Sequence, residues 1–91
     1  MTRISVKKLI WTEANVLHLR KHRVTPDEVS VAVSQFKYHK RTHDKRYLLV
    51  GRSGKRIISV VIKRQASSVY YVVTARDAGR KERRRLYEKE K

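Results

Sequence analysis

The fold of this protein is decided by the stretch Tyr70 to Tyr87, which reads YYVVTARDAGRKERRRLY. Its first part is apolar and rich in β-branched residues, which favours a strand, and its second part is dense in arginine and favours a helix. The pattern fixes the guanidinium of Arg76 at the end of a central strand and places several more on a basic helix. Such an arrangement suits a polyanion, and nucleic acid is the most common polyanion in a cell.

Two further strands are predicted before this stretch, at Tyr47–Arg52 and Arg56–Lys63, and the strand within it covers Val69–Ala75. Ser53-Gly54 is typical of a tight turn between the first two. Because short hairpin connections cannot make parallel crossovers, we expect these strands to be largely antiparallel. Consecutive apolar residues such as Val60-Val61-Ile62 indicate that both faces of the strands are partly covered.

The clearest local signal in the first half of the chain is Thr25-Pro26-Asp27-Glu28. It combines a threonine N-cap, a proline at the first helical position and a glutamate that completes a capping box, which predicts a helix from Pro26 to about Gln35. Apolar residues also favour a helix over Thr12–His22 and a short strand within Ile4–Trp11. The last helix is expected to run from an N-cap at Asp77 towards Lys89.

The segment Phe36–Arg46 is polar and basic without a clear period, so it is interpreted as either a long loop or a weak edge strand. The predicted order is β-α-α-β-β-β-α, with the helices on one side of a curved, mainly antiparallel sheet. Ninety-one residues are enough for one hydrophobic core, and no repeat or linker divides them. We therefore expect a single α+β domain over residues 1–91.

The charge balance narrows the possible partners. The chain has 24 Lys and Arg against 8 Asp and Glu, which gives a net charge of +16. Solubility alone needs much less charge, so a polyanion or an acidic protein is the expected partner. The absence of cysteine excludes disulfides, thiolate chemistry and cysteine-ligated zinc. No stretch has the pattern of a signal peptide or a membrane span, and we expect a cytoplasmic protein that does not use the membrane.

Several short segments in order along the chain resemble a known family. They are Lys8-Leu9-Ile10-Trp11, Lys21-His22, Tyr47-Leu48-Leu49-Val50-Gly51-Arg52, Val73-Thr74-Ala75-Arg76 with Ala78, and Lys81-Glu82-Arg83 with Tyr87. The set resembles the BrnT-type toxins of bacterial type II toxin–antitoxin systems, which share the RelE/ParE-like fold. The resemblance implies an endoribonuclease that cleaves RNA without the ribosome. It also implies a small DNA-binding antitoxin of the ribbon-helix-helix type as partner.

Two positions depart from the family's pattern. Arg23 stands where the family usually has a glycine, which brings the turn after the first helix into question because a non-glycine residue resists positive φ. The segment Lys37–Arg46 is basic, whereas the family's corresponding loop is commonly acidic. This second difference bears on how the chain grips RNA or an antitoxin.

Metal-free RNA cleavage needs a proton removed from the 2′-hydroxyl, a proton given to the leaving oxygen, and stabilisation of the charge on the phosphorane. Arg76 is the first candidate for the last task, since a guanidinium meets two phosphate oxygens through its planar fork. The alternative for Arg76 is a structural ion pair with Glu82 or Glu13. Arg52, at the end of the neighbouring strand, is either a second phosphate contact or an ordinary solvated arginine.

Three residues are candidates for proton transfer. Lys8 matches the amino-terminal lysine of the family and is otherwise a surface lysine; proton transfer would require its pKa to be lowered. His22 has a suitable ordinary pKa, but a histidine that closes a helix more often caps carbonyl groups, and we favour this structural role. Glu82 is either a general base or the residue that orients Arg76, and we favour orientation.

The remaining basic and aromatic candidates are expected to bind RNA. Trp11 either stacks on a base or anchors the core, and we favour the core. The expected RNA-binding residues are Trp11, Lys21, Arg80, Arg83, Arg84, Arg85 and Tyr87. The histidine pairs His18/His22 and His39/His43 lack a third ligand, so neither a metal nor another cofactor is expected. Two other functions stay open at this point: a nucleic-acid-binding module without catalysis, and a domain that holds an acidic protein.

Overall fold

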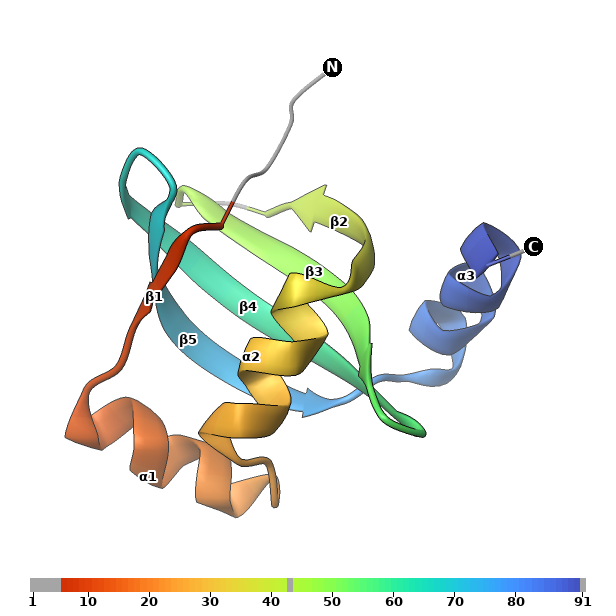
Figure 1. The fold of residues 1–91 in the computed structure, drawn as a ribbon, viewed down its shortest axis with the longest axis horizontal. Helices are drawn as coiled ribbons and strands as arrows, with labels where there is room; N and C mark the ends of the chain where they lie inside the picture. The colour runs from red at the N-terminus through yellow and green to blue at the C-terminus, as the bar shows by residue number, and fades with distance from the viewer. Residues whose placement is uncertain (1–5, 43, 91) are drawn as a thin grey trace.

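The structure, a computed structural model, describes residues 6–42 and 44–90 of the chain. These residues form a five-stranded sheet with the strand order β1-β5-β4-β3-β2, and three helices (Figure 1). The elements are β1 (Lys8–Ile10), α1 (Glu13–Lys21), α2 (Pro26–Ser34), β2 (Phe36–Arg41), β3 (Arg46–Ser53), β4 (Arg56–Ala66), β5 (Val69–Asp77) and α3 (Arg80–Glu90).

The sheet is mainly antiparallel, as predicted. Strands β2 to β5 pair in chain order as antiparallel neighbours, and the register places Leu49 of β3 opposite Val60 of β4. Only the pairing of β1 with β5 is parallel among the described strands, with Lys8 opposite Val69. A parallel pairing needs a long crossover connection, and here α1, α2 and β2 to β4 all lie between the two strands in the chain. The α+β fold class is therefore confirmed.

The capping signals explain where the first two helices begin. The hydroxyl of Thr12 accepts a hydrogen bond from the Asn15 N–H at 3.1 Å, so α1 begins directly after Thr12. At α2, the Thr25 hydroxyl accepts from the Glu28 N–H at 3.2 Å, while the Glu28 carboxylate accepts from the Thr25 N–H at 2.9 Å. The N-cap at Thr12 and the capping box at Thr25 satisfy backbone donors that a helix start leaves free. The predicted start of the helix at Pro26 is confirmed.

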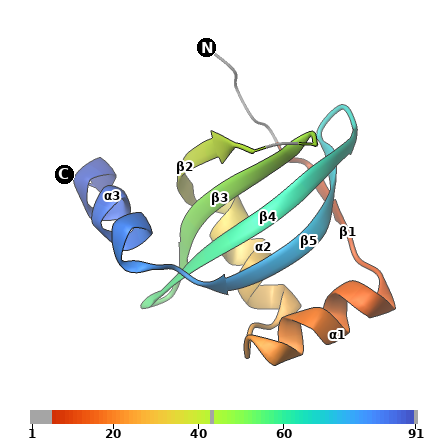
Figure 2. The same ribbon diagram turned by 180° about the vertical axis from the view of Figure 1, so that it is seen from behind.

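The helices cover both faces of the sheet, which corrects the expectation that they lie on one side. Along β3, Tyr47 and Leu49 belong to the core under α1 and α2, whereas Val50 belongs to a second cluster around Leu86 of α3. Helix α2 lies in front of the sheet in Figure 1 and behind it in Figure 2, and α3 stands beside β2 and β3. The reason is the run of apolar residues in β3 and β4, which gives both faces an apolar surface that a helix can cover.

Two predicted boundaries change. Of the segment left open as a loop or a weak edge strand, Phe36–Arg41 forms edge strand β2, with a register shift between Phe36 and Tyr38. Helix α3 begins at Arg80, so the prediction of an N-cap at Asp77 was wrong. Strand β5 continues through Asp77 instead, and the Ala78 N–H extends the pairing with a 3.0 Å hydrogen bond to the Ile57 carbonyl.

One close approach fixes the distance between α2 and the sheet. Gly51 of β3 lies directly under the Ala32 carbonyl of α2, and a Cβ on Gly51 would collide with that backbone group. Gly51 and Ala32 are both buried. The absence of a side chain at Gly51 therefore allows the helix backbone to rest on the strand itself.

Candidate nucleic-acid interface

A row of residues crosses the sheet on the face that α3 covers. Tyr38 of β2 lies opposite Val50 of β3, Val50 lies opposite Ser59 of β4, and Ser59 lies opposite Arg76 of β5. Glu82 of α3 closes over this row. Its carboxylate accepts hydrogen bonds from the Arg76 guanidinium at 3.0 and 3.2 Å and from the Ser59 hydroxyl at 2.7 Å.

The electrostatics of this cluster keep Glu82 ionised. Burial would raise the pKa of the Glu82 carboxyl, but hydrogen bonds from Arg76, from the Gly79 N–H and from Ser59 outweigh it, so the pKa is lowered below its ordinary value. The Glu82 side chain is only 17% exposed, whereas that of Arg76 is 47% exposed. Arg76 therefore keeps part of its guanidinium free for a ligand while Glu82 holds it.

Glu82 also explains why α3 begins where it does. Its carboxylate accepts a hydrogen bond from the Gly79 N–H at 2.8 Å, and Glu82 occupies the third position of the helix, as in one half of a capping box. The backbone carbonyl of Glu82 accepts a hydrogen bond from the Tyr38 hydroxyl at 3.2 Å. These contacts fit the favoured interpretation of Glu82 as the residue that orients Arg76.

Arg52, at the end of β3, is also paired with α3. Its guanidinium donates hydrogen bonds to the Glu90 carboxylate at 2.6 and 2.9 Å, and it lies 5.7 Å from the centre of the Tyr87 ring. Both strand-end arginines of the sequence prediction thus lie on the α3 face, each with one carboxylate of that helix. The structure brings Arg52, Arg76, Glu82 and Tyr87 to one side of the sheet.

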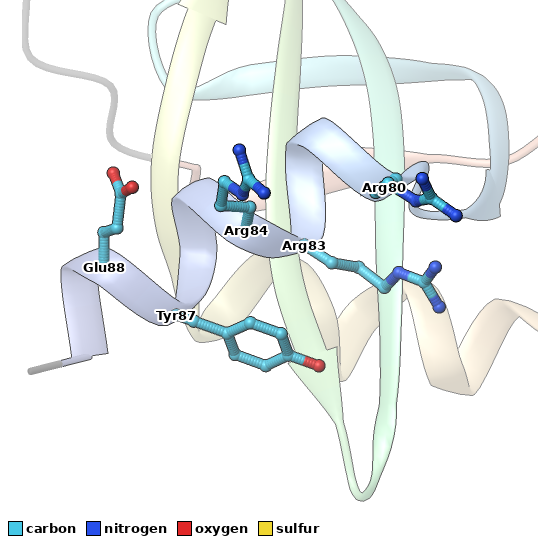
Figure 3. A pocket seen from close by; sticks show the side chains of 5 residues that line it. All are labelled: Arg80, Arg83, Arg84, Tyr87 and Glu88. Atoms are coloured by element: carbon cyan, nitrogen blue, oxygen red, sulfur yellow. The ribbon is translucent and has the colours of Figure 1, made fainter.

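The outer surface of α3 carries three of the four arginines that were predicted on this helix. A shallow groove of about 630 Å³ runs along the helix and is lined by Arg80, Arg83, Arg84, Tyr87 and Glu88 (Figure 3). None of these three arginines has an ion pair within the described part of the chain. Arg85 lies on the inner side instead, with its guanidinium 5.1 Å from the centre of the Tyr38 ring.

Lys8 and Trp11 lie in a different groove. It has a volume of about 370 Å³ and is formed by the chain around β1 and by Ser30, Val33 and Ser34 of α2. Trp11 is half-buried and packs against the main core, in agreement with the favoured core role. Lys8 lies opposite Val69, seven residues before Arg76 along β5, which corresponds to roughly 23 Å at the rise of a strand. Lys8 and Arg76 do not meet.

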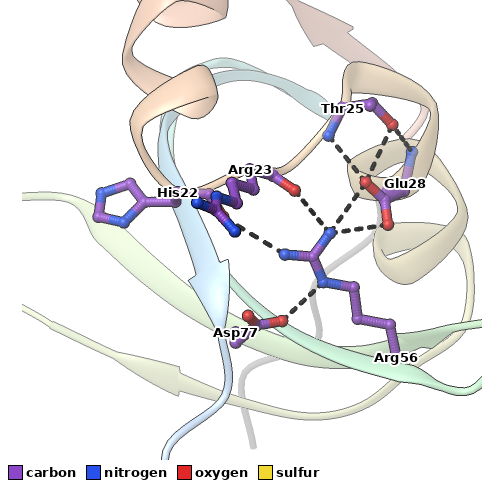
Figure 4. A network of polar contacts seen from close by, with 6 residues as sticks. All are labelled: His22, Arg23, Thr25, Glu28, Arg56 and Asp77. Atoms are coloured by element: carbon purple, nitrogen blue, oxygen red, sulfur yellow. Dashed lines mark hydrogen bonds and ion pairs between the residues drawn. The ribbon is translucent and has the colours of Figure 1, made fainter.

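Lys21 and His22 lie at the end of α1, across the sheet from Arg76. The His22 ring is exposed and lies 5.4 Å from the His18 ring, and Figure 4 shows it pointing away from the polar residues around it. The backbone N–H of His22 donates to the Leu19 carbonyl at 3.0 Å, and His22 is the C-cap of the helix. In the described part of the chain, His22 therefore contacts the end of its own helix and does not contact Arg76.

The sequence analysis missed Arg56, which lies at the centre of a polar network with His22, Arg23, Glu28 and Asp77 (Figure 4). Its guanidinium donates to the Asp77 carboxylate at 2.6 Å, to the Glu28 carboxylate at 2.9 Å and to the backbone carbonyl of Arg23 at 2.7 Å. The hydrogen bonds that Arg56 donates to the Asp77 and Glu28 carboxylates raise the pKa of Arg56, so it is always charged. Nothing near Arg56 in the sequence signals this role, because its partners are brought to it only by the fold.

This network also explains the departure at Arg23. Arg23 has φ 55°, so the turn after α1 does require the positive φ that glycine adopts easily. The carbonyl of Arg23 and, at 3.3 Å, that of His22 accept hydrogen bonds from Arg56. The hydrogen bonds from Arg56, which lies outside the turn, therefore stabilise the strained backbone at Arg23.

The described residues contain no group of three or more side chains of the kinds that hold a metal ion. No helix in this part of the chain is long and apolar enough to cross a membrane.

The protein has a mixed α+β fold, defined by the strand order of the sheet and by the parallel edge strand β1. The arginines of the sheet and of α3 give it a cationic face. Among solved structures, the chain is similar to the Brucella abortus ribonuclease toxin BrnT, whose crystal structure was determined at 1.1 Å. The TM-score is 0.64 at 25% sequence identity, and the match covers 80% of this chain and 97% of that chain. Comparison of the sequence with protein-family models and with curated proteins gives no match. The predicted resemblance to BrnT-type toxins and the predicted fold are confirmed.

Proposed function

We propose that this protein is the toxin of a type II toxin–antitoxin system and acts as an endoribonuclease that needs neither a metal ion nor the ribosome. The observation that carries the proposal is the similarity over 80% of the chain to BrnT, a ribonuclease toxin. The net charge of +16 and the arginines of the α3 face support it, because RNA is a polyanion. A small ribbon-helix-helix antitoxin and a cytoplasmic location are part of the same proposal.

Arg76 is the proposed catalytic residue. Its planar fork would meet the phosphate oxygens as negative charge develops on the phosphorane. Glu82 fixes the guanidinium through two hydrogen bonds and leaves it about half exposed, which is what a positioned but accessible charge requires. Arg52 is proposed as a second phosphate contact, made when a phosphate replaces Glu90.

The other predicted residues receive supporting roles in this proposal. Lys8 and His22 lie away from Arg76, so RNA contacts suit them better than a proton transfer beside Arg76. Lys21 belongs to the same outer contacts, whereas Trp11 keeps its role as an anchor of the core. The exposed arginines of α3 and Tyr87 would grip the RNA strand. If five phosphates are engaged, affinity for single-stranded RNA should fall about a hundredfold between 50 and 200 mM salt.

The alternative is a nucleic-acid-binding module without catalysis. The observation that favours it is the state of Glu82, whose carboxylate is already held by Arg76, Ser59 and the Gly79 N–H. A carboxylate held in this way with a lowered pKa is a weak general base.

The deciding experiment incubates the protein with a labelled single-stranded RNA in the presence of EDTA. We expect cleavage by the wild type and a loss of about 10²–10³-fold in the Arg76→Ala variant, the usual cost of removing one group that stabilises transition-state charge. Lys63→Ala is the matched control, since the one ion pair of Lys63 within the described residues is to Asp44, at 3.6 Å, and Lys63 is not among the residues proposed to bind RNA. Salt-sensitive binding without cleavage of several RNAs would replace the ribonuclease proposal with the binding module.

A further inference from the structure

A small cleft between α3 and the edge of the sheet has no role in the proposal so far. It has a volume of about 240 Å³ and is lined by Tyr38, Lys40, Leu48, Lys81, Glu82 and Arg85. Pockets that enclose a drug-sized ligand measure roughly 300–1,000 Å³, so this cleft suits a smaller group. Glu82 belongs both to the cleft and to the Arg76 cluster, so the two are adjacent.

The side chains enter the cleft from two elements with the expected periodicity. On β2, Tyr38 and Lys40 alternate with His39 and point to the α3 face, since Lys40 lies opposite Leu48 of the α3 cluster. On α3, Lys81 and Arg85 are four residues apart and therefore share one side of the helix. The strand and the helix thus bring three cations to one place.

The positive charges of the cleft are not neutralised by carboxylates of the described residues. Lys40, Lys81 and Arg85 form no ion pair with any carboxylate of the described residues. The single acidic lining residue, Glu82, is already neutralised by Arg76. Arg85 is held over the face of the Tyr38 ring, which limits its freedom before a ligand arrives.

We propose that this cleft is a phosphate subsite, in which Lys40, Lys81 and Arg85 bind a phosphodiester group of single-stranded RNA next to the one held by Arg76. The inference rests on the proposed function in taking RNA as the ligand. It also gives the basic segment around β2 a role in substrate binding. A protein partner fits less well, because the centre of a protein interface is depleted of charged residues and this cleft is lined mainly by them.

The test measures binding of a 2′-O-methyl RNA oligonucleotide, which lacks the attacking hydroxyl and stays intact. The double variant Lys40→Gln/Lys81→Gln removes two exposed cations, one from a strand and one from a helix. The matched control is Arg20→Gln/Arg64→Gln, which removes two exposed charges from α1 and β4, outside the cleft. Fluorescence anisotropy at several salt concentrations gives the affinity and its salt dependence, and thermal unfolding checks that each variant is folded.

We expect the cleft variant to bind about tenfold more weakly than the wild type at 150 mM salt, with a salt slope smaller by about 0.7, because the cleft neutralises one phosphate and each neutralised phosphate of a single strand contributes about 0.7. The control should change affinity less than threefold. Equal losses in both variants would overturn the subsite. So would RNA binding that is unchanged in the cleft variant. Because the 2′-O-methyl RNA is not cleaved, its binding is measured independently of catalysis. A wild type that binds this RNA through the cleft but cleaves no unmodified RNA would support the phosphate subsite and contradict the proposed ribonuclease activity.

Discussion

Arg56 and Arg76 are both arginines of the sheet paired with carboxylates, but they lie on opposite faces and are held differently. Arg56 is 25% exposed and bonds two carboxylates and two backbone carbonyls. Arg76 is 47% exposed and bonds one carboxylate and the carbonyl of its own neighbour, Asp77. An arginine whose three guanidinium nitrogens all donate within the protein holds the fold together, whereas one with a more exposed side chain is available for a ligand. The predictions below test this contrast.

The largest effect is expected from Arg56→Ala. The substitution leaves the Glu28 carboxylate and the Arg23 carbonyl without their main donor, and it should cost about 2–3 kcal/mol of unfolding free energy. Urea unfolding measures it, with Lys63→Ala as a control that should change stability by less than about 1 kcal/mol because its ion pair is exposed. RNA cleavage per folded molecule should stay at the wild-type value. Lost cleavage with unchanged stability would reverse the roles of the two arginines.

Glu82→Gln separates orientation from general base catalysis. A glutamine keeps one oxygen for the Ser59 and Gly79 donors but weakens the hold on Arg76, so kcat should fall about tenfold, or about 1.4 kcal/mol in activation free energy. The pH profile of kcat should keep its shape. Glu88→Gln, on the exposed side of the same helix, is the control. A loss above a thousandfold together with a missing acid limb would identify Glu82 as the base.

The ion pairs of Arg56 should also make the free energy of unfolding depend on pH, with a smaller effect than the Arg56→Ala substitution. Hydrogen bonds from Thr25 and Arg56 lower the pKa of Glu28 below its ordinary 4.5, and Arg56 lowers the pKa of Asp77 below its ordinary 3.8. Groups with a lowered folded-state pKa stabilise the protein above the unfolded pKa, and the contribution is lost as pH falls. Unfolding free energies should therefore decrease below about pH 4.5, and less so in Arg56→Ala than in the wild type. Parallel curves for the two proteins would contradict this linkage.

The smallest effect is expected from Arg23→Gly. Arg23 adopts φ 55°, which costs a residue with a Cβ about 1–2 kcal/mol, and glycine gives back part of this gain through its greater unfolded-state entropy. The variant should be about 0.5–1 kcal/mol more stable by urea unfolding, and it keeps the carbonyl that Arg56 holds. A loss of stability would mean that the Arg23 side chain itself contributes to the turn.

The parts of the fold that were predictable from the sequence depend on local signals. Thr25 and Glu28 lie within one helical turn, and the hairpins of β3 to β5 need only short connections, so both were visible in the order of residues. Strand β2 was left open because its outer edge has no neighbouring strand and its residues are polar. The position of α3 depends on Leu86 packing into a cluster formed by distant strands, and no local pattern encodes which face is covered.

Parts of the candidate site were likewise predictable from local sequence signals, and other parts were not. The end of an apolar strand marked Arg76, and Glu82 was favoured as the residue that orients it; the structure places the two in contact. Arg56 was missed because Glu28 lies 28 residues and Asp77 lies 21 residues away in the chain. No pattern in the sequence indicated that Lys40 and Arg85 line the same cleft, because that cleft forms only where β2 and α3 pack together in the folded protein. The catalytic role of Arg76 remains a prediction until cleavage is measured.

The contact under α2 has a consequence for how this sequence can drift or be redesigned. Gly51 and Gly54 are three residues apart, yet they tolerate change very differently. At Gly54, φ is 63° and the space beyond the backbone is open, so an asparagine would be accepted at modest cost. At Gly51 even a methyl group would meet the Ala32 carbonyl and force the helix off the sheet. A library that varies β3 should therefore return only glycine at position 51, whatever selection is applied to the side of the sheet that α3 covers.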